Sequence, residues 1–191
     1  MCEHTLSRRR LLGGIAVAGT AGGAGCFGDD GSGGETPDPV TLDGSKVCDV
    51  CGMIIEGSYG PNGQVAYDGD YPSDREGAAY YDSVRELYID RFTQQNRGNE
   101  PIVAYVTDYA SIEYDIETRD GDQYITGSVD PETFVKADEA VFVVKSGVRG
   151  AMGVDLLPFE KPDVAESFVE THGGRVVPAD DITRELVELL K

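Results

Sequence analysis

Two apolar runs decide the fold: Pro-Ile-Val-Ala-Tyr-Val-Thr at 101–107 and Ala-Val-Phe-Val-Val-Lys at 140–145. Both are rich in β-branched and aromatic residues, and both are too short for a buried helix, so each predicts a buried strand. Each run belongs to a longer pattern that reads strand, strand, helix, strand. The chain therefore contains two consecutive segments with the same predicted order of elements, called the first and second pass below.

The first pass ends with the strand at 101–107. Short β-type segments at 64–68 and 78–82 are separated by the turn-rich sequence GDYPSDREG. Ser83, with Glu86 three residues later, is typical of a capping box at the start of a helix, and an amphipathic run follows it. We expect the strand after this helix to lie in the interior of the sheet, because it is apolar along nearly its whole length.

The second pass surrounds the strand at 140–145. A strand is predicted before it at 123–126, and the loop SGVRGAMGVDLLPFEK after it. Pro162 then opens a helix that ends at Gly173 and Gly174, and a short strand and a last helix complete the chain. This mixed order predicts an α+β fold with mostly antiparallel sheet.

Residues 1–25 are typical of an export signal and not of a folded segment. Arg8 and Arg9, in the sequence SRRRLL, resemble a twin-arginine signal, and the weakly apolar stretch that follows is too short to span a bilayer. The sequence AGC that ends at Cys26 resembles a lipoprotein cleavage site. We therefore predict a diacylated Cys26 that anchors the mature chain to the outer face of the cell membrane. An ordinary signal peptide with an incidental cysteine is the alternative.

The stretch after the lipidation site is rich in Gly, Asp, Ser and Pro. It cannot bury enough apolar surface to fold, so we predict a flexible tether at 26–45. The remainder, 46–191, has the length of one compact domain.

The chain carries 35 Asp and Glu against 16 Lys and Arg, a formal net charge of -19. Self-repulsion at this charge is screened at molar salt, where the Debye length falls to about 3 Å. The charge indicates adaptation to a high-salt, halophilic milieu. It also argues against nucleic-acid partners, because phosphate repels carboxylate.

Few residues of the mature chain suit acid–base or nucleophilic catalysis. His4 leaves with the signal, and His172 lies at the predicted end of a helix, where a capping or surface role fits it. No nucleophile elbow accompanies any serine. These features indicate a protein that is not an enzyme.

Cys48 and Cys51 form a CxxC pair in the run VCDVCGM. A structural zinc site usually needs four ligands, more than these cysteines and one histidine supply. A redox pair normally opens a helix, whereas a turn-rich segment follows here. A structural disulfide also remains possible in an exported protein. Soft-metal binding is the interpretation we favour, because thiolate and thioether sulfur select Cu(I) over hard cations.

Two methionines could add sulfur ligands. Met53 lies two residues after Cys51, and Met152 stands in a loop between Gly150 and Gly153. A thioether bordered by glycines is unusual for a core position, although Met152 on its own would be read as a packing residue.

Taken in order, these motifs resemble the NosL family, lipoprotein copper chaperones associated with the maturation of nitrous oxide reductase. The resemblance covers roughly residues 46–185. The CGM motif alone is weak, but the series is specific: Cys51-Gly52-Met53, Gly60-Pro61-Asn62-Gly63-Gln64, Met152-Gly153 with Pro158-Phe159, and Ala165-x-x-Phe168 with Gly173-Gly174.

The resemblance implies a fold of two ββαβ halves and one Cu(I) bound outside the cytoplasm. By position, it implies that Cys51 and Met152 are copper ligands and that Met53 is a further candidate. Cys48 matches a CxxCGM form found in part of the family. Many members have a histidine shortly before Gly-Pro, where this chain has Glu56-Gly-Ser-Tyr, so another ligand or a lower coordination number is implied here. The implied partner is a copper-accepting client, nitrous oxide reductase or a related cuproprotein.

Two other functions remain open from the residues. A thiol–disulfide oxidoreductase would use Cys48 and Cys51 and would not need Met152. A non-catalytic binding or assembly lipoprotein would keep its cysteines for structure alone.

Overall fold

The computed structural model describes residues 36–190. The predicted signal at 1–25, with Arg8 and Arg9, and the predicted lipidation site Cys26 lie outside the described residues. Within the described part, every helix is too short or too polar to span a membrane.

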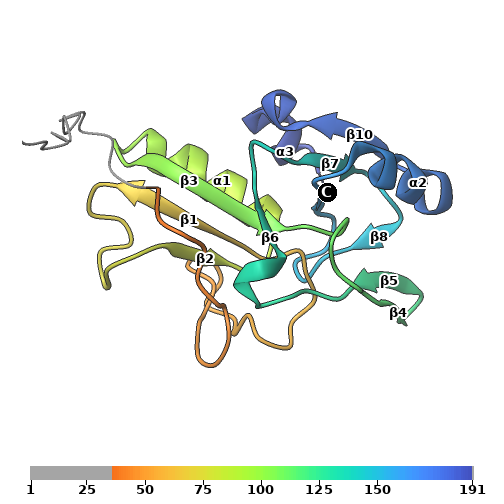
Figure 1. Cartoon of the computed structure of the whole chain (residues 1–191), viewed down its shortest axis with the longest axis horizontal. Helices are drawn as coiled ribbons and strands as arrows, with labels where there is room; N and C mark the ends of the chain where they lie inside the picture. The colour runs from red at the N-terminus through yellow and green to blue at the C-terminus, as the bar shows by residue number, and fades with distance from the viewer. Residues whose placement is uncertain (1–35, 191) are drawn as a thin grey trace, which may run out of the picture. The chain divides into compact units, whose positions relative to one another are not determined.

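The described part contains ten strands, three α-helices and two short 3-10 helices (Figure 1). In chain order they are β1 (Gly63–Asp68), β2 (Ala79–Tyr81), α1 (Val84–Gln95), β3 (Glu100–Thr107), β4 (Ile116–Arg119), β5 (Asp122–Ile125), η1 (Pro131–Thr133), β6 (Phe134–Lys136), β7 (Val141–Val144), β8 (Val148–Arg149), β9 (Leu156–Phe159), α2 (Pro162–His172), β10 (Arg175–Pro178), η2 (Ala179–Asp181) and α3 (Arg184–Glu188). The strands form three sheets, with orders β2-β1-β3-β6, β10-β7-β9 and β4-β5-β8. Only the β5–β8 pairing is parallel among these strands, so the predicted α+β fold with mostly antiparallel sheet is confirmed.

Two ββαβ units build the first two sheets. The first is β1-β2-α1-β3 and the second is β7-β9-α2-β10. In each unit the first strand lies between the second strand and the strand after the helix, and it is antiparallel to both. The prediction of two ββαβ halves is therefore confirmed.

The strands of the second half differ from the prediction. The strand expected at 123–126 is β5, which belongs to the small third sheet. Its place in the second half is taken by β9, which lies inside the segment expected to be a loop. Pro158 in β9 argues against a strand from sequence, but proline is tolerated on an edge strand, and β9 is at the edge of its sheet.

Both faces of β7 are buried, which explains its unbroken apolar run. Phe142 and Val144 join the core around α1, whereas Val143 joins the core under α2. The ring of Phe142 packs edge-on against Tyr88 of α1, with centroids 5.6 Å apart. Helix α1 of the first half is thus packed against the sheet of the second half, and the two halves share one core.

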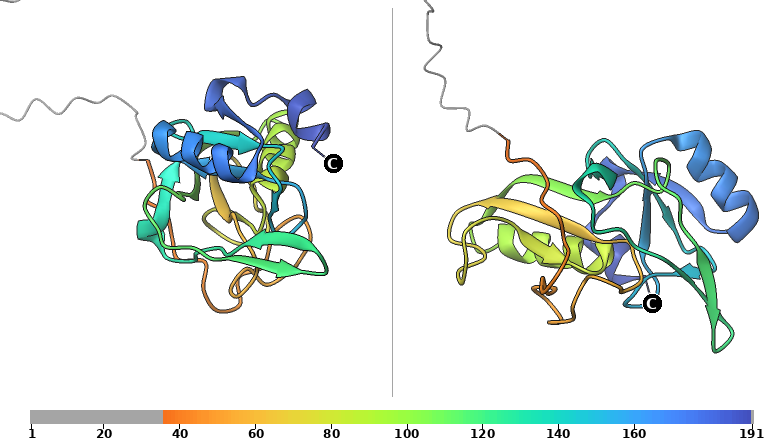
Figure 2. Two further views of the ribbon diagram at one scale, coloured as in Figure 1. Left: turned by 90° about the vertical axis from the view of Figure 1, so that its right-hand side faces the viewer. Right: turned by 60° about the horizontal axis from the view of Figure 1, so that its bottom comes forward.

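The first described residues run across the sheet of the first half (Figure 2, orange). The backbone N–H and C=O of Val40 both pair with the side-chain amide of Gln64 on β1, at 2.9 Å each. The hydroxyl of Tyr105 donates to the carbonyl of Pro37 at 3.1 Å, and Leu42 is fully buried. The folded part of the chain therefore begins before residue 46, inside the stretch expected to be a tether.

The start of α1 receives hydrogen-bond acceptors from both halves of the chain. The hydroxyl of Ser83 accepts from the N–H of Glu86 at 3.2 Å, as the capping motif predicts. The carboxylate of Asp155, just before β9, accepts from the N–H groups of Arg85 at 2.7 Å and Leu156 at 2.8 Å. A buried carboxylate of the second half thus holds the first turn of the helix of the first half.

Burial raises the pKa of Asp155 to about 7, although its hydrogen bonds from Ser83, Leu156 and Arg85 act in the opposite direction. The folded protein therefore binds the Asp155 proton more tightly than the unfolded chain does. This contribution to stability is complete below about pH 4 and is lost as the pH rises toward about 7.

Replacing Asp155 by Asn should remove this pH dependence. The amide oxygen can still accept the two backbone N–H groups but does not ionise, so relative to the wild type the variant should gain stability between pH 4.5 and pH 7.5. The upper limit of the gain over this pH range is about 3 kcal/mol. Urea unfolding of both proteins at the two pH values measures it. A stability difference that stays constant across this range would contradict the assignment.

Candidate metal site

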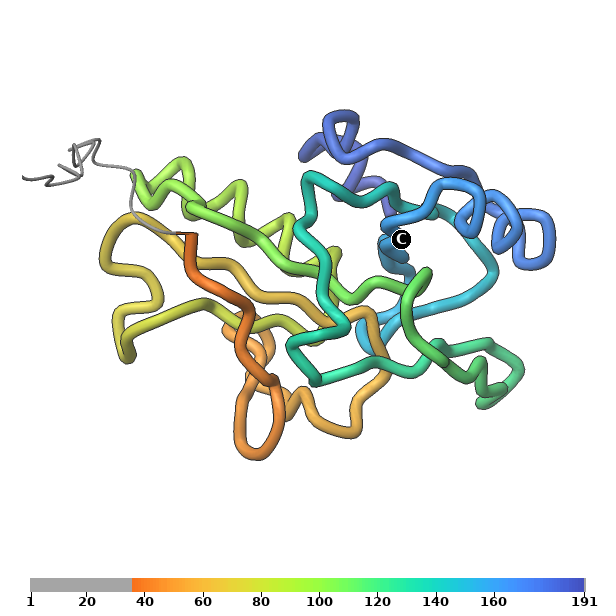
Figure 3. Tube along the Cα trace, in the orientation of Figure 1, coloured from red at the N-terminus to blue at the C-terminus, as the bar shows by residue number. Residues whose placement is uncertain are grey.

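The two cysteines of the described chain lie on a tight hairpin, drawn in orange in Figure 3. Val47 and Ile54 pair across it in an antiparallel bridge, and the N–H of Cys48 donates to the carbonyl of Met53 at 2.8 Å. Gly52 has a φ of +74°, a conformation that suits glycine, and it lets the chain turn back after the second cysteine.

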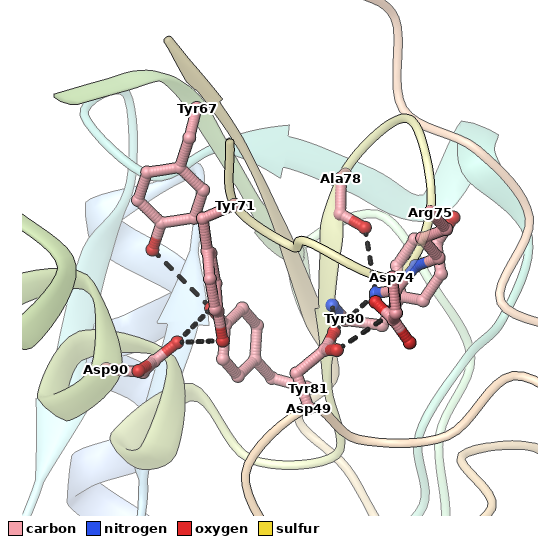
Figure 4. Close-up of polar contacts among 9 residues, drawn as sticks. All are labelled: Asp49, Tyr67, Tyr71, Asp74, Arg75, Ala78, Tyr80, Tyr81 and Asp90. Carbon is pink, nitrogen blue, oxygen red and sulfur yellow. Dashed lines mark hydrogen bonds and ion pairs between the residues drawn. The ribbon is translucent and has the colours of Figure 1, made fainter. Parts of the chain in front are cut away.

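Asp49, between the two cysteines, fastens this hairpin to strand β2 (Figure 4). Its carboxylate receives both Nη groups of Arg75, one of them at 3.0 Å, and the backbone N–H of Tyr80 at 2.6 Å. Its own N–H donates to the carbonyl of Tyr80 at 2.8 Å. Arg75 is held in turn by the carbonyl of Ala78 at 3.0 Å and lies over the ring of Tyr80. Bidentate pairing of this kind fixes geometry as well as charge, so the cysteine loop has a defined position.

Four side chains converge at this hairpin: Cys48, Cys51, Asp82 and Glu86. One potential ligand atom from each lies within 4.8 Å of all the others. The thiol of Cys48 donates to Glu86 Oε2 at 3.3 Å, and that of Cys51 to Asp82 Oδ2 at 3.4 Å. Cys48 is only 1% exposed, whereas Cys51 is accessible to solvent. The arrangement has the size and donor types of a metal site with one buried side and one open side.

Burial is the main reason that the pKa values of both thiols are raised, that of Cys48 far above its ordinary range. Backbone N–H groups act in the opposite direction: those of Cys51, Asp82 and Val50 lower the pKa of Cys48, and that of Met53 lowers the pKa of Cys51. The negative charges of Asp82 and Glu86 raise the pKa of Cys51 further. Without a metal both thiols are therefore protonated, while the backbone already offers donors that would stabilise thiolates.

Sequence reasoning missed the two carboxylates. Glu86 was expected to complete the capping box of α1, but its carboxylate accepts from Cys48. Asp82 directly precedes the capping residue and is fully buried. The spacing of helical side chains could not indicate this pair, because Asp82 precedes the N-cap Ser83 and lies outside α1.

Met152 lies at the tip of a second tight turn. Gly150 and Gly153 close this turn with reciprocal backbone hydrogen bonds of 2.7 and 3.1 Å. A side chain at Gly150 would place its Cβ 2.5 Å from the carbonyl oxygen of Gly60 and 2.6 Å from Asp155 Oδ2, so only glycine fits. The side chains of Met152 and Met53 are 39% and 47% exposed. Gly150 therefore serves close packing beneath the turn, Gly153 allows its positive φ of +95°, and the Met152 side chain is exposed.

The fold brings the Met152 turn and the cysteine hairpin into one region. Met53 of the hairpin and Ala151 of the turn line the same open hollow of about 790 Å³, together with Tyr59 and Tyr124. The turn is also linked through Asp155 to the first turn of α1, which begins just after Asp82. Segments about a hundred residues apart in sequence thus border one hollow, although neither Met152 itself nor any of the four clustered side chains lines it.

His172 is outside this region, as expected for a helix-end residue. It is the last residue of α2, and its ring packs on that of Phe168 with centroids 4.5 Å apart.

Comparisons with known proteins agree with this fold. The model of the NosL family matches residues 39–187. A copper-binding lipoprotein NosL from Stutzerimonas stutzeri is 26% identical over 154 residues, covering 81% of this chain and 70% of that protein. A protein of the same name from Achromobacter cycloclastes is 42% identical over 55 residues, 28% of each chain. The crystal structure of the copper chaperone NosL from Shewanella denitrificans matches with a TM-score of 0.56 and 25% identity, over 75% of this chain and 94% of that chain.

The thiol chemistry of the cluster can be tested without metal. Replacing Asp82 by Asn removes a negative charge that raises the pKa of Cys51, so the thiolate fraction at pH 7.5 should rise and alkylation of Cys51 by iodoacetamide should become several-fold faster. Peptide mapping by mass spectrometry separates Cys51 from the slower, buried Cys48. Glu139→Gln, an exposed carboxylate on another loop, is the control and should leave the rate unchanged. Slower alkylation of Cys51 in Asp82→Asn would contradict this account.

Proposed function

The chain belongs to the NosL family, and on that premise we propose that it is a copper carrier that holds one Cu(I) at the cysteine hairpin and passes it to a client protein. The observation that carries the proposal is the convergence of two free thiols on a fixed hairpin with two carboxylates from the start of α1. Relatives of this chain are a copper-binding lipoprotein and a copper chaperone by name.

The donor set suits Cu(I) better than a hard cation. Cys51 would supply a thiolate and most of the affinity, and Met152 a neutral thioether as the second donor. Met53 or Cys48 would complete a two- or three-coordinate site, with Cys48 on its buried side. Sulfur donors select Cu(I), so Asp82 and Glu86 would act mainly in the metal-free protein, where they hold the protonated thiols in place through the hydrogen bonds that they accept.

A carrier of this kind has to retain its metal and still give it up. Cys51, Met53 and Met152 are all exposed, so donors from a partner could reach the metal before the old bonds break. Transfer would then proceed by exchange of ligands between the two proteins. No bond of a substrate is made or broken, so the protein would not be an enzyme.

The client is inferred from the family resemblance, and the location from the export and lipidation motifs. We propose nitrous oxide reductase, or a related cuproprotein, as the client, which would place the chain in denitrification. Export by the twin-arginine signal and acylation of Cys26 would hold the protein at the outer face of the membrane, in a high-salt milieu.

A thiol–disulfide oxidoreductase is the less favoured function. The cysteines of such enzymes normally have lowered pKa values, which make the thiolate available for attack. In this chain burial and the neighbouring carboxylates raise the pKa of Cys51. A zinc site remains chemically possible because two sulfur and two oxygen donors lie together, and metal titration separates it from copper binding.

Competition with a Cu(I) chelator tests the ligands. Cys51→Ser should weaken Cu(I) binding at least about a hundredfold, or about 2.7 kcal/mol, and Met152→Leu about tenfold, because each removes one sulfur donor. Cys48→Ser and Met53→Leu report which residue completes the site. Thermal unfolding of each apo variant checks that the fold is intact.

Three outcomes would count against the proposal. Unchanged Cu(I) affinity in both Cys51→Ser and Met152→Leu would reject this site. Tighter selection of Zn(II) than of Cu(I) by the wild type would identify a zinc protein. Disulfide exchange activity that is lost in Cys48→Ser and kept in Met152→Leu would support the oxidoreductase.

A further inference from the structure

The large apolar side chains that the described residues expose are concentrated around the cysteine hairpin. Eight such side chains are exposed in residues 36–190, and five belong to the hairpin or to the Met152 turn. These five, the apolar collar, are Val47, Val50, Met53, Ile54 and Met152. In a chain with 35 acidic residues, such a group at one place is unexpected.

The collar cannot easily turn its side chains inward. Val47 and Ile54 are fixed opposite each other by the bridge at the base of the hairpin. Val50 follows Asp49, which Arg75 and Tyr80 hold against β2. Four of the five exposed side chains are therefore fixed on the hairpin that also carries the accessible thiol of Cys51.

From this arrangement we propose that the apolar collar is the docking surface for the copper-accepting partner, and that the partner presents an apolar centre bordered by Lys and Arg. This inference rests on the proposed function, because it assigns the surface through which the metal leaves. Apolar contact around Cys51 would exclude water from the site while ligands exchange, and it would hold the partner's donors near the metal.

The charges beside the collar select among the possible occupants. Asp43 and Glu56 flank the hairpin, and Glu56 accepts from the N–H of Gly44 at 2.8 Å. Lys46 is the one cation of the hairpin, and it pairs with Asp43 at 3.6 Å. A second copy of this chain would bring the same carboxylates together, and an anionic lipid surface would repel them. A basic border on a partner protein complements them.

The test compares exposed apolar residues inside and outside the collar. Ile54→Ser and Val50→Ser remove collar side chains without removing a sulfur, whereas Ile102→Ser and Leu189→Ser remove equally exposed side chains elsewhere. Each full-length protein is loaded with Cu(I) and mixed with apo nitrous oxide reductase at subsaturating concentrations. We expect the collar variants to transfer copper at least tenfold more slowly, with chelator-measured Cu(I) affinity within twofold of wild type and both controls unchanged.

Two charge-reversal variants test whether the partner has a basic border. Asp43 and Glu139 are similarly exposed carboxylates, each paired with a lysine three residues away. Asp43→Lys should slow transfer several-fold, because it places a cation beside the collar, and Glu139→Lys should not.

The outcomes separate this inference from the proposed function. Normal transfer by Ile54→Ser and Val50→Ser would overturn the docking surface and leave copper binding intact. Wild-type protein that binds Cu(I) but delivers none to the reductase would overturn both docking and client. A collar variant that alters only self-association in light scattering, or only vesicle binding, would assign the surface to a second copy or to lipid and would also overturn the inference. If the wild-type protein did not bind Cu(I), the proposed function itself would be wrong.

Discussion

The structure depends on how the N–H groups at the start of α1, which have no partner within the helix, are hydrogen-bonded. A helix begins with backbone donors that have no partner within the helix, and here Ser83 and Asp155 accept from them. Asp155 comes from the second half of the chain and is buried, so this contact fixes the two halves in register. The same position places Asp82 and Glu86 beside the cysteines and brings the Met152 turn close to the hairpin. One capped helix end thus positions the two carboxylates of the candidate site.

The electrostatics of the site suit a positively charged cargo. Burial, with the two neighbouring carboxylates adding to its effect on Cys51, keeps the thiols protonated when no metal is present, because a further negative charge there would be costly. A cation changes this balance, since it stabilises thiolates that the backbone N–H groups already face. The preference of sulfur ligands would then select the cation that binds, and the surrounding carboxylates would raise the local concentration of any cation.

Much of the fold could be predicted from the sequence because the first half follows simple rules. Its two short strands, its helix with Ser83 as cap and its long apolar strand all lie where alternation and capping indicate. The second half was harder, because Pro158 disguises an edge strand and a loop separates it from β7. The cysteines and methionines could be found from residue chemistry and motif order. Asp82 and Glu86 could not be placed from the sequence, because their contact with the hairpin depends on the pairing of Asp49 with Arg75 and Tyr80.

The two cysteines of the hairpin differ in burial, and this difference bears on how a bound metal would be transferred. Cys48 is enclosed by the core and by Glu86, and Cys51 lies at the solvent boundary with exposed apolar side chains around it. A metal held between them would be reachable from one direction only. A partner would therefore meet the exposed donors first, and its own donors could bind the metal before the old bonds break. Rigidity beneath the hairpin, provided by the Asp49–Arg75 pair, serves the same end. It would keep the hairpin in one position while the partner's donors approach the exposed side.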